Sequence, residues 1–325
     1  MTRQQQRTVN MTFNNSTQGN DSLSEQSRII FNCMYGMFFI LGLLFNGFAL
    51  WVFGYKMKTL TETRVYMINL AVADVFLLFT FPLVVSRMRI LHPLTDDLFC
   101  QVTQSIYLIN KYMSMCLVTL ISVDRYIGIR YPLKARSLRS PQKAAVSCAL
   151  LWTMVIIIVS IRVNLQIYEG GFCFQTQKED NSKTVFFSLL MFFIPLVILT
   201  FCSIETIRSL RMKKKTDTHE EKIIQKAIYI VSANLIVFII CFLPLHVALL
   251  IQFVLNEKRM PNVLRIKKFL PLASCIANAN CCLDAVCYYF VVKEFQEMSG
   301  IWPLFKFSKT KANTDKDTQY TTISH

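Results

Sequence analysis

Residues 185–204 read VFFSLLMFFIPLVILTFCSI, an apolar run of twenty positions without a charged side chain. As an α-helix, such a run rises about 1.5 Å per residue and reaches across the roughly 30 Å hydrocarbon core of a lipid bilayer. A strand of a membrane barrel would instead alternate apolar and polar residues over about ten positions. The run therefore predicts a helix that spans a membrane.

Six more apolar stretches lie on either side of this one. The chain is 53% hydrophobic and 17% charged, which is less polar than an ordinary soluble domain. Because only helices and closed barrels satisfy every backbone amide in lipid, we expect an all-α membrane protein with seven transmembrane helices. The predicted spans are 29–55, 65–85, 98–123, 144–161, 185–204, 227–255 and 269–292.

Polar segments flank the predicted transmembrane domain of residues 29–292. Residues 293–325 are expected to begin with a short amphipathic helix in the membrane interface and to end as a cytoplasmic tail. Residues 1–28 contain acceptor sites for N-glycosylation, which are useful only if this tail lies outside the cell. The acceptors are Asn10, Asn14, Asn15 and Asn20.

The loop charges support an extracellular N-terminus and a multi-pass protein of the plasma membrane. Lys and Arg accumulate in cytoplasmic loops, and the predicted inner loops hold 3, 5 and 7 of them, against 2, 3 and 5 in the outer loops. The net charge of +15 mostly reflects these loops, which lie beside anionic lipid. Nothing in the sequence indicates binding to nucleic acid. Cys100 and Cys173 both fall on the oxidising side, so a disulfide between them is expected.

Two carboxylates lie inside predicted spans, where a charge needs a partner or a function. Asp74 and Asp284 are accompanied by Ser114 and Asn280 at similar depth. Two close carboxylates do not both stay ionised without a cation, so the group is expected to hold a sodium ion or to share a proton. A purely structural hydrogen-bond network is the alternative. No other cofactor is expected.

Two cations are predicted near the outer side of the bundle, Lys111 in the third span and Arg162 at the end of the fourth. Cations facing an outer cavity would attract an anion. The alternative is that Lys111 pairs with an internal carboxylate and that the surrounding charges are only solvated. Further candidate ligand-binding residues are Arg87, Tyr107, His246, Arg265 and Lys268.

An acid and a base are adjacent at the inner end of the third span, in Asp124-Arg125-Tyr126. In a resting bundle, the arginine is able to pair with the neighbouring acid. When the inner ends of the helices separate, Arg125 becomes available to a protein partner.

These landmarks together resemble the rhodopsin-like, or class A, family of G-protein-coupled receptors across almost the whole chain. The resemblance also rests on Asn46, on Trp152, on FIICFLP ending at Pro244 and on Asp284 to Tyr288, which is similar to the seventh-helix Asn-Pro-x-x-Tyr motif. It implies that Asp124, Arg125, Tyr126, Phe242, Pro244, Asp284 and Tyr288 take part in activation and in coupling to a heterotrimeric G protein.

Segments such as LRSPQKAA, EGGFCF and NCCLDAVCYY resemble a smaller group of these receptors, which bind acidic small molecules or lysophospholipids. The resemblance implies coupling to Gi or to the twelve/thirteen class, with arrestin and receptor kinases as further partners. In that group, basic residues stand at the positions of Lys111 and Arg162. Here Lys111 replaces an arginine and loses planar bidentate geometry. Phe242 replaces a usual tryptophan, and Ala285 a usual proline.

Other function classes fit the sequence less well. An ion-coupled transporter or channel would also use buried carboxylates, but no inverted repeat is visible. A scavenging receptor without signalling would be expected to carry a damaged Asp-Arg-Tyr motif. An enzyme is disfavoured because no nucleophile with a base, metal cluster or phosphate loop is recognisable.

Overall fold

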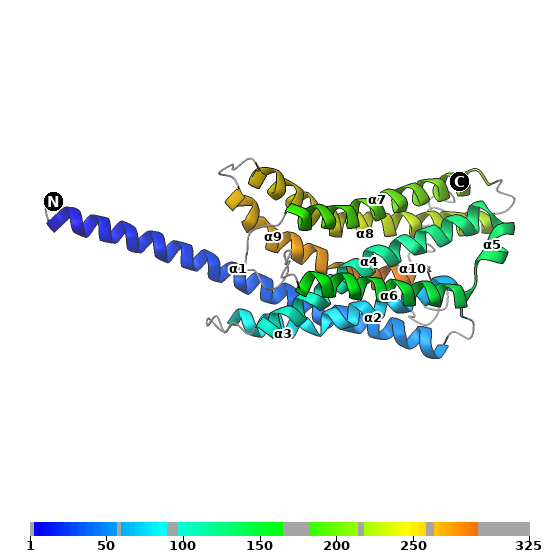
Figure 1. The fold of residues 1–325 in the computed structure, drawn as a ribbon, viewed down its shortest axis with the longest axis horizontal. Helices are drawn as coiled ribbons and strands as arrows, with labels where there is room; N and C mark the ends of the chain where they lie inside the picture. The colour runs from blue at the N-terminus through cyan, green and yellow to red at the C-terminus, as the bar shows by residue number, and fades with distance from the viewer. Residues whose placement is uncertain are drawn as a thin grey trace, which may run out of the picture.

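The computed structural model describes residues 3–56, 60–89, 97–164, 182–213, 218–257 and 263–291, and these residues form helices that run side by side (Figure 1). No strand occurs in the described part of the chain, so the expected all-α bundle is confirmed. The helices are α1 (Arg3–Trp51), the π-helix η1 (Val52–Lys56), α2 (Glu62–Leu78), α3 (Thr80–Arg89), α4 (Asp97–Arg130), α5 (Pro132–Leu138), α6 (Pro141–Asn164), α7 (Ser182–Arg211), α8 (Thr218–Glu257), α9 (Val263–Asn278) and α10 (Asn280–Val291).

The apolar segments of these helices match the predicted spans. A shorter apolar stretch, 269–285, covers most of α9 and the first half of α10. Large apolar side chains such as Ile157, Val197 and Ile240 are exposed on the outside of the bundle, as expected for a surface that faces lipid. Among the described residues, six segments are long and apolar enough to cross a membrane: 29–55, 62–85, 101–130, 141–162, 185–211 and 224–255.

The second span is interrupted at Phe79, where α2 ends and α3 begins. Pro82 follows three residues later, and a proline removes one backbone N–H from the helical ladder. The Thr80 hydroxyl donates a hydrogen bond of 2.6 Å to the carbonyl of Leu77, which supports the chain across the break.

The seventh span is interrupted in the same way, at Ala279 between α9 and α10. The Ala279 N–H is shared between the carbonyls of Cys275 and Ile276, at 3.2 and 3.1 Å. The family's proline is missing here, at Ala285, so the bend arises from this local change in the backbone hydrogen bonds. The predicted seventh span is thus divided between two helices.

The first helix packs closely on the second span. A Cβ at Gly42 would lie 2.6 Å from Cδ2 of Leu78, so only a glycine allows this approach without a shift. The Asn46 side chain donates to the carbonyl of Cys281 at 2.7 Å, which ties α1 to α10. Helix α1 begins at Arg3, so the helix of the first span extends back through the polar N-terminal segment.

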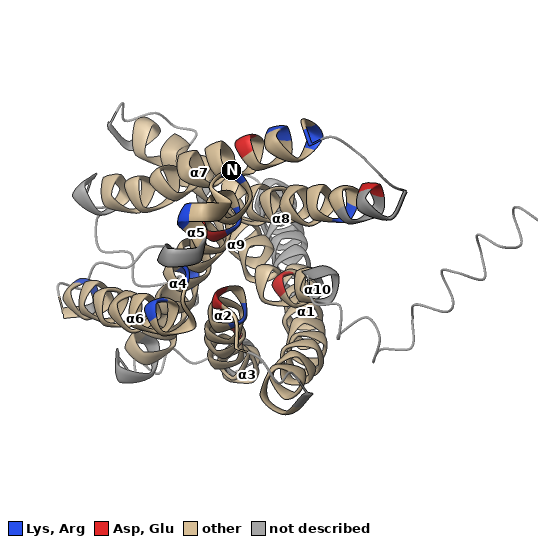
Figure 2. Ribbon diagram, turned by 90° about the vertical axis from the view of Figure 1, so that its right-hand side faces the viewer, with Lys and Arg blue, Asp and Glu red and all other residues tan. Residues whose placement is uncertain are grey.

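Helix α4 lies at the centre of the bundle, against α2, α5, α6, α7 and α8. Its side chains Leu108, Met113 and Met115 are fully buried. Figure 2 looks onto the end of the bundle that lies opposite the N-terminal end and shows charged residues at the near ends of α2, α6 and α8. Because α4 runs through the whole bundle, it carries residues of each candidate site described below.

Candidate functional site

The two predicted cations are both buried in the bundle. Lys111 on α4 is 4% exposed and Arg162 on α6 is 5% exposed. The Lys111 ammonium donates to Ser188 Oγ on α7 at 3.4 Å, and Nη1 of Arg162 donates to the Tyr112 hydroxyl at 2.5 Å. Three helices therefore contribute to one basic centre, which we call the cation pair.

Aromatic rings complete the surroundings of the cation pair. Lys111 Nζ lies 5.7 Å from the ring centroid of Tyr112, and the Arg162 guanidinium lies 5.7 Å from that of Phe187. Such contacts stabilise a cation through the ring quadrupole, but they do not cancel its charge. Hydroxyl groups and aromatic rings from α4 and α7 thus contribute to the surroundings of both cations.

His246 on α8 is fully buried beside an aromatic column. Its Nδ1 is hydrogen-bonded to the carbonyl of Phe242 at 2.7 Å, and its ring stacks on Phe192 at 4.0 Å. Phe192 stacks in turn on Phe238, which packs on Phe242 at 5.2 Å. This column connects α7 with α8 and places the predicted switch residue Phe242 beside the predicted ligand residue His246.

The remaining predicted ligand residues are only partly described. Tyr107 is 2% exposed and lies on α4, four residues before Lys111. The side chains of Arg87, Arg265 and Lys268 lie outside the described residues.

The two predicted carboxylates form a second buried centre, which we call the carboxylate cluster. Asp74 on α2 accepts a hydrogen bond of 2.9 Å from Asn110 on α4, and Asp284 on α10 accepts one of 2.6 Å from Asn280. Asp74 and Asp284 are close enough for their charges to interact. Ser114 lies on α4, four residues after Asn110, and is fully buried.

Several oxygens of the carboxylate cluster have no hydrogen-bond partner among the described residues. They include Oδ2 of Asp74, Oγ of Ser114 and Oδ1 of Asn46. Buried oxygens without donors are the ligands that a hard cation such as sodium prefers, so the donor set fits that ion. No group of three or more His, Cys, Asp or Glu residues able to hold a metal occurs in the described ranges.

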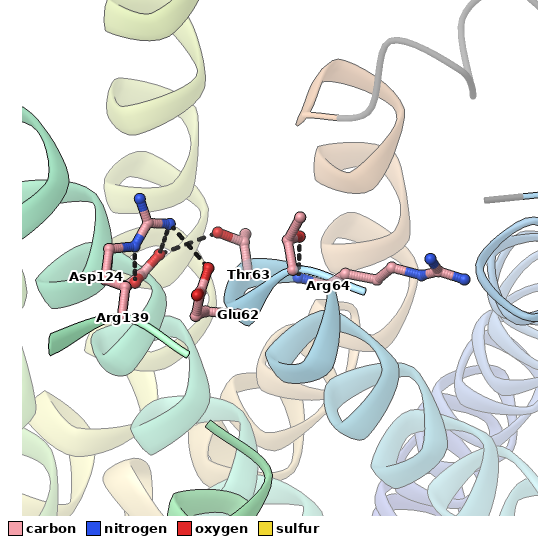
Figure 3. Close-up of polar contacts among 6 residues, drawn as sticks. Glu62, Thr63, Arg64, Asp124 and Arg139 are labelled. Atoms are coloured by element: carbon pink, nitrogen blue, oxygen red, sulfur yellow. Dashed lines mark hydrogen bonds and ion pairs between the residues drawn. The ribbon is translucent and has the colours of Figure 1, made fainter. Parts of the chain in front are cut away.

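A third polar centre lies at the end of α4 that carries Asp124-Arg125-Tyr126. Asp124 is 8% exposed and forms an ion pair with Arg139, which follows α5, with Nε to Oδ1 at 2.8 Å and Nη2 to Oδ2 at 2.9 Å. The Thr63 hydroxyl on α2 also donates to Oδ2, at 3.0 Å. Figure 3 shows Arg139 and Asp124 facing α2. The ion pair of Asp124 is thus with Arg139, and no ion pair joins it to Arg125 within the described residues.

The other predicted coupling residues surround this end of α4 or lie between it and the carboxylate cluster. Tyr126 packs edge-on against Tyr131 and Phe201, and Tyr288 is buried against Phe53 at 5.9 Å. Pro244 lies inside α8, two residues after Phe242.

The residues of these centres that sequence reasoning missed include Asn110, Ser188, Thr63 and Arg139. Asn110 could have been predicted from the sequence, because it lies one helical turn before Ser114 and therefore on the same face of the helix. The sequence predicts Tyr112 only as an apolar wall of the ligand site, because its hydroxyl contact with Arg162 depends on how α4 and α6 pack. Ser188 is an ordinary serine in an apolar helix. Arg139 is one of several basic loop residues, without a pattern to distinguish it.

Some predicted features lie outside what the structure describes. These are the Cys100–Cys173 disulfide, the interfacial helix after residue 292 and the glycosylation acceptors Asn10, Asn14, Asn15 and Asn20, whose side chains are not described. They remain predictions.

Comparison with known proteins agrees with this architecture. The family model described as "7 transmembrane receptor (rhodopsin family)" matches residues 45–288. The chain is 45% identical to G-protein coupled receptor 35 of Mus musculus over 88% of this chain and 93% of that protein. It is 35% identical to G-protein coupled receptor 55 of Homo sapiens, over 79% of this chain and 83% of that protein. It is 29% identical to lysophosphatidic acid receptor 6 of Gallus gallus, over 80% of this chain and 89% of that protein.

Proposed function

The chain belongs to the rhodopsin family of seven-transmembrane receptors, and from this premise we propose that it binds an extracellular anionic small molecule or lysophospholipid at the cation pair. Binding activates a heterotrimeric G protein of the Gi or the twelve/thirteen class. Arrestin and receptor kinases then act on the cytoplasmic side. The alternatives of a transporter, channel or enzyme do not agree with the family to which the chain belongs.

The observation that carries this proposal is the burial of two cations, Lys111 and Arg162, on neighbouring helices. A carboxylate or phosphate that approaches two buried cations gains electrostatic attraction and charge-assisted hydrogen bonds. Arg162 offers planar donors to such a group, whereas Lys111 offers a point charge. The relative in Gallus gallus is named for lysophosphatidic acid, a phosphate ester of this charge type.

The geometry suggests how ligand binding reaches the other end of the bundle. A ligand on the cation pair contacts α4, α6 and α7 and lies near the column of His246, Phe192 and Phe242. A ligand shifts an equilibrium only through its different affinity for the two arrangements. A movement of α8 against α7 changes this column and is passed towards Arg125 and Tyr288, which contact the G protein.

The carboxylate cluster has a separate role in the proposal. Asp74, Ser114, Asn280 and Asp284 would hold a sodium ion, whose charge would neutralise the two carboxylates while the bundle is at rest. In this role the cluster links α2, α4 and α10. Its unpartnered oxygens support the assignment.

The proposal also includes the orientation in the plasma membrane. The N-terminus with its glycans and the Cys100–Cys173 disulfide lie outside the cell, and the Asp124 end of α4 lies in the cytosol. The loop charges support this orientation.

A G-protein dissociation assay in cells tests the anionic-ligand proposal. We expect oleoyl lysophosphatidate, or an acidic metabolite from a panel of mono- and dicarboxylates, to activate the receptor, and uncharged monooleoylglycerol to fail. Lys111→Ala and Arg162→Ala should each weaken the response at least about tenfold, because truncating a buried charge partner costs about 2–5 kcal/mol. Lys111→Arg, which keeps the charge, is the matched control. A neutral agonist that acts equally on both alanine variants would refute the proposal.

A further inference from the structure

Arg139 pairs with Asp124 and Glu62, and Thr63 donates to the same Asp124 carboxylate; we call these four residues the Arg139 clamp (Figure 3). The guanidinium makes two parallel hydrogen bonds to the Asp124 carboxylate, and its Nη2 also lies 3.5 Å from Glu62 Oε2. Thr63 donates to the same carboxylate. Both oxygens of Asp124 are thus engaged by donors that lie outside α4.

The local backbone fixes the position of Arg139. It ends the short helix α5 with extended dihedral angles, φ −83° and ψ 127°, and its N–H donates to the Ala135 carbonyl at 2.8 Å. Ala135 is 5% exposed, so α5 is anchored in the bundle. Pro141, the first residue of α6, favours an extended conformation before it and turns the chain. Arg139 therefore projects from a defined corner.

Helix α4 leaves room for the guanidinium. A Cβ at Gly128, one turn beyond Asp124, would lie 3.0 Å from Nη1 and 3.6 Å from Cζ of Arg139. The side chain thus lies directly over a glycine, which lets it approach the helix closely. This is an observation about Arg139 that is independent of its ion pair.

The clamp determines which cation neutralises Asp124. Asp124 is 8% exposed, so its charge needs a partner. Two arginines are within reach: Arg139 across the loop, and Arg125 as its neighbour in sequence. Two parallel bonds from a guanidinium to a carboxylate are among the stronger polar contacts in proteins. With Arg139 in place, Arg125 forms no ion pair with another described residue.

We propose that Arg139 is a positioning residue for G-protein coupling, which neutralises Asp124 and thereby keeps Arg125 available to the G protein. Without Arg139, the buried carboxylate recruits Arg125, and nucleotide exchange requires that this new pair be broken. The inference rests on the coupling part of the proposed function, but not on the identity of the ligand.

Receptor-catalysed nucleotide exchange tests the clamp directly. Full-length receptor in phospholipid nanodiscs is mixed with a purified G protein of the Gi or thirteen class, without ligand and with oleoyl lysophosphatidate as the probe. We expect Arg139→Ala to lower the exchange rate about tenfold or more, the scale of one charge-assisted hydrogen bond. The exchange rate of Arg139→Lys should lie between that of Arg139→Ala and that of the wild type. Lys143 is exposed and lies four residues after Arg139, so Lys143→Ala should leave the exchange rate unchanged.

A second substitution separates this role from a purely structural one. Asp124→Asn removes the charge that would capture Arg125, so the double variant Asp124→Asn/Arg139→Ala should recover the rate of Asp124→Asn alone. A double variant as slow as Arg139→Ala would show that Arg139 only supports the loop, and would overturn the inference. An unchanged or increased exchange rate in Arg139→Ala would also overturn the inference, since the Arg139–Asp124 pair would then have no effect on coupling or would stabilise the resting state.

Gly128→Ala provides a milder test if Arg139→Ala fails to reach the membrane. The added methyl displaces the guanidinium without removing it, so exchange should fall by a smaller factor, and Asp124→Asn should again restore it. An unaltered rate in a well-expressed Gly128→Ala variant would contradict the clamp. Wild-type receptor and Arg125→Ala are the reference points: an inactive wild type, or an active Arg125→Ala, overturns the proposed function itself.

Discussion

Tyr112 is the residue that joins the two cations of the proposed ligand site. Its hydroxyl accepts from Arg162, while its ring lies under Lys111. We expect Tyr112→Phe to keep the ring contact but to release the guanidinium from its defined position. Potency of an anionic agonist such as oleoyl lysophosphatidate should fall about tenfold or more, the typical effect of one hydrogen bond to a charged group. Concentration–response curves in the G-protein dissociation assay measure this change.

Tyr35→Phe is the matched control for that prediction. Tyr35 is equally buried, at 1% exposure, and its hydroxyl contacts Asn278 at 3.5 Å instead of a cation. Loss of a buried hydroxyl alone should therefore leave potency nearly unchanged. Equal losses in both variants would mean that Tyr112 acts on general stability and not on the cation pair.

Single residues differ in how well the sequence predicts them. A charge in an apolar span, such as Lys111 or Asp74, stands out because lipid penalises it. Ser188 and Asn110 are neutral, and their importance depends on which helix faces they meet after packing. Arg139 is even less visible, since its partner lies fifteen positions away and across a turn.

Close packing of helices gives a prediction at the scale of elements. Gly42 and Gly47 both lie on α1, but an added Cβ meets Leu78 at 2.6 Å at the first position and nothing within 4 Å at the second. Gly42→Ala should destabilise the receptor by about 1–3 kcal/mol through overpacking. Gly47→Ala should be neutral or stabilising by up to about 1 kcal/mol, because alanine favours helix. Apparent melting temperatures in detergent compare the two, and a Gly42→Ala variant as stable as Gly47→Ala contradicts the close α1–α2 contact.

Helix breaks were harder to predict than helix positions. Long apolar runs define the spans, since each must cross the bilayer as a hydrogen-bonded unit. The break at Phe79 has a visible cause in Pro82. The break at Ala279 has none in its own residues, because Ala is a strong helix former and the family's proline is absent. It reflects how α9 and α10 fit the neighbouring helices.

At the scale of the whole molecule, the orientation of the bundle is open to a direct test. Replacing Asn10, Asn14, Asn15 and Asn20 with Gln should abolish the mobility shift that glycosidase treatment produces in wild-type receptor on a gel. An epitope placed after His325 should be reached by antibody only in permeabilised cells. If glycosidase has no effect on the wild type and the epitope is accessible in intact cells, the proposed orientation is wrong.

Helix α4 carries residues of all three centres: Asn110 and Ser114 of the carboxylate cluster flank Lys111 and Tyr112 of the cation pair, and Asp124 of the Arg139 clamp follows on the same helix. If sodium stabilises the resting arrangement, replacing sodium chloride with choline chloride should raise the affinity of the oleoyl lysophosphatidate probe. Linked sites commonly couple by about 1–3 kcal/mol, so the shift should be fivefold or more. Asp74→Asn removes one of the two charges, and its affinity should no longer depend on sodium. Glu205→Gln removes a carboxylate on α7 that lies outside the cluster and pairs with Arg208 at 3.5 Å, so it should keep the wild-type dependence. Equal affinity of wild-type receptor in both salts would show that the cluster is a hydrogen-bond network without a bound cation.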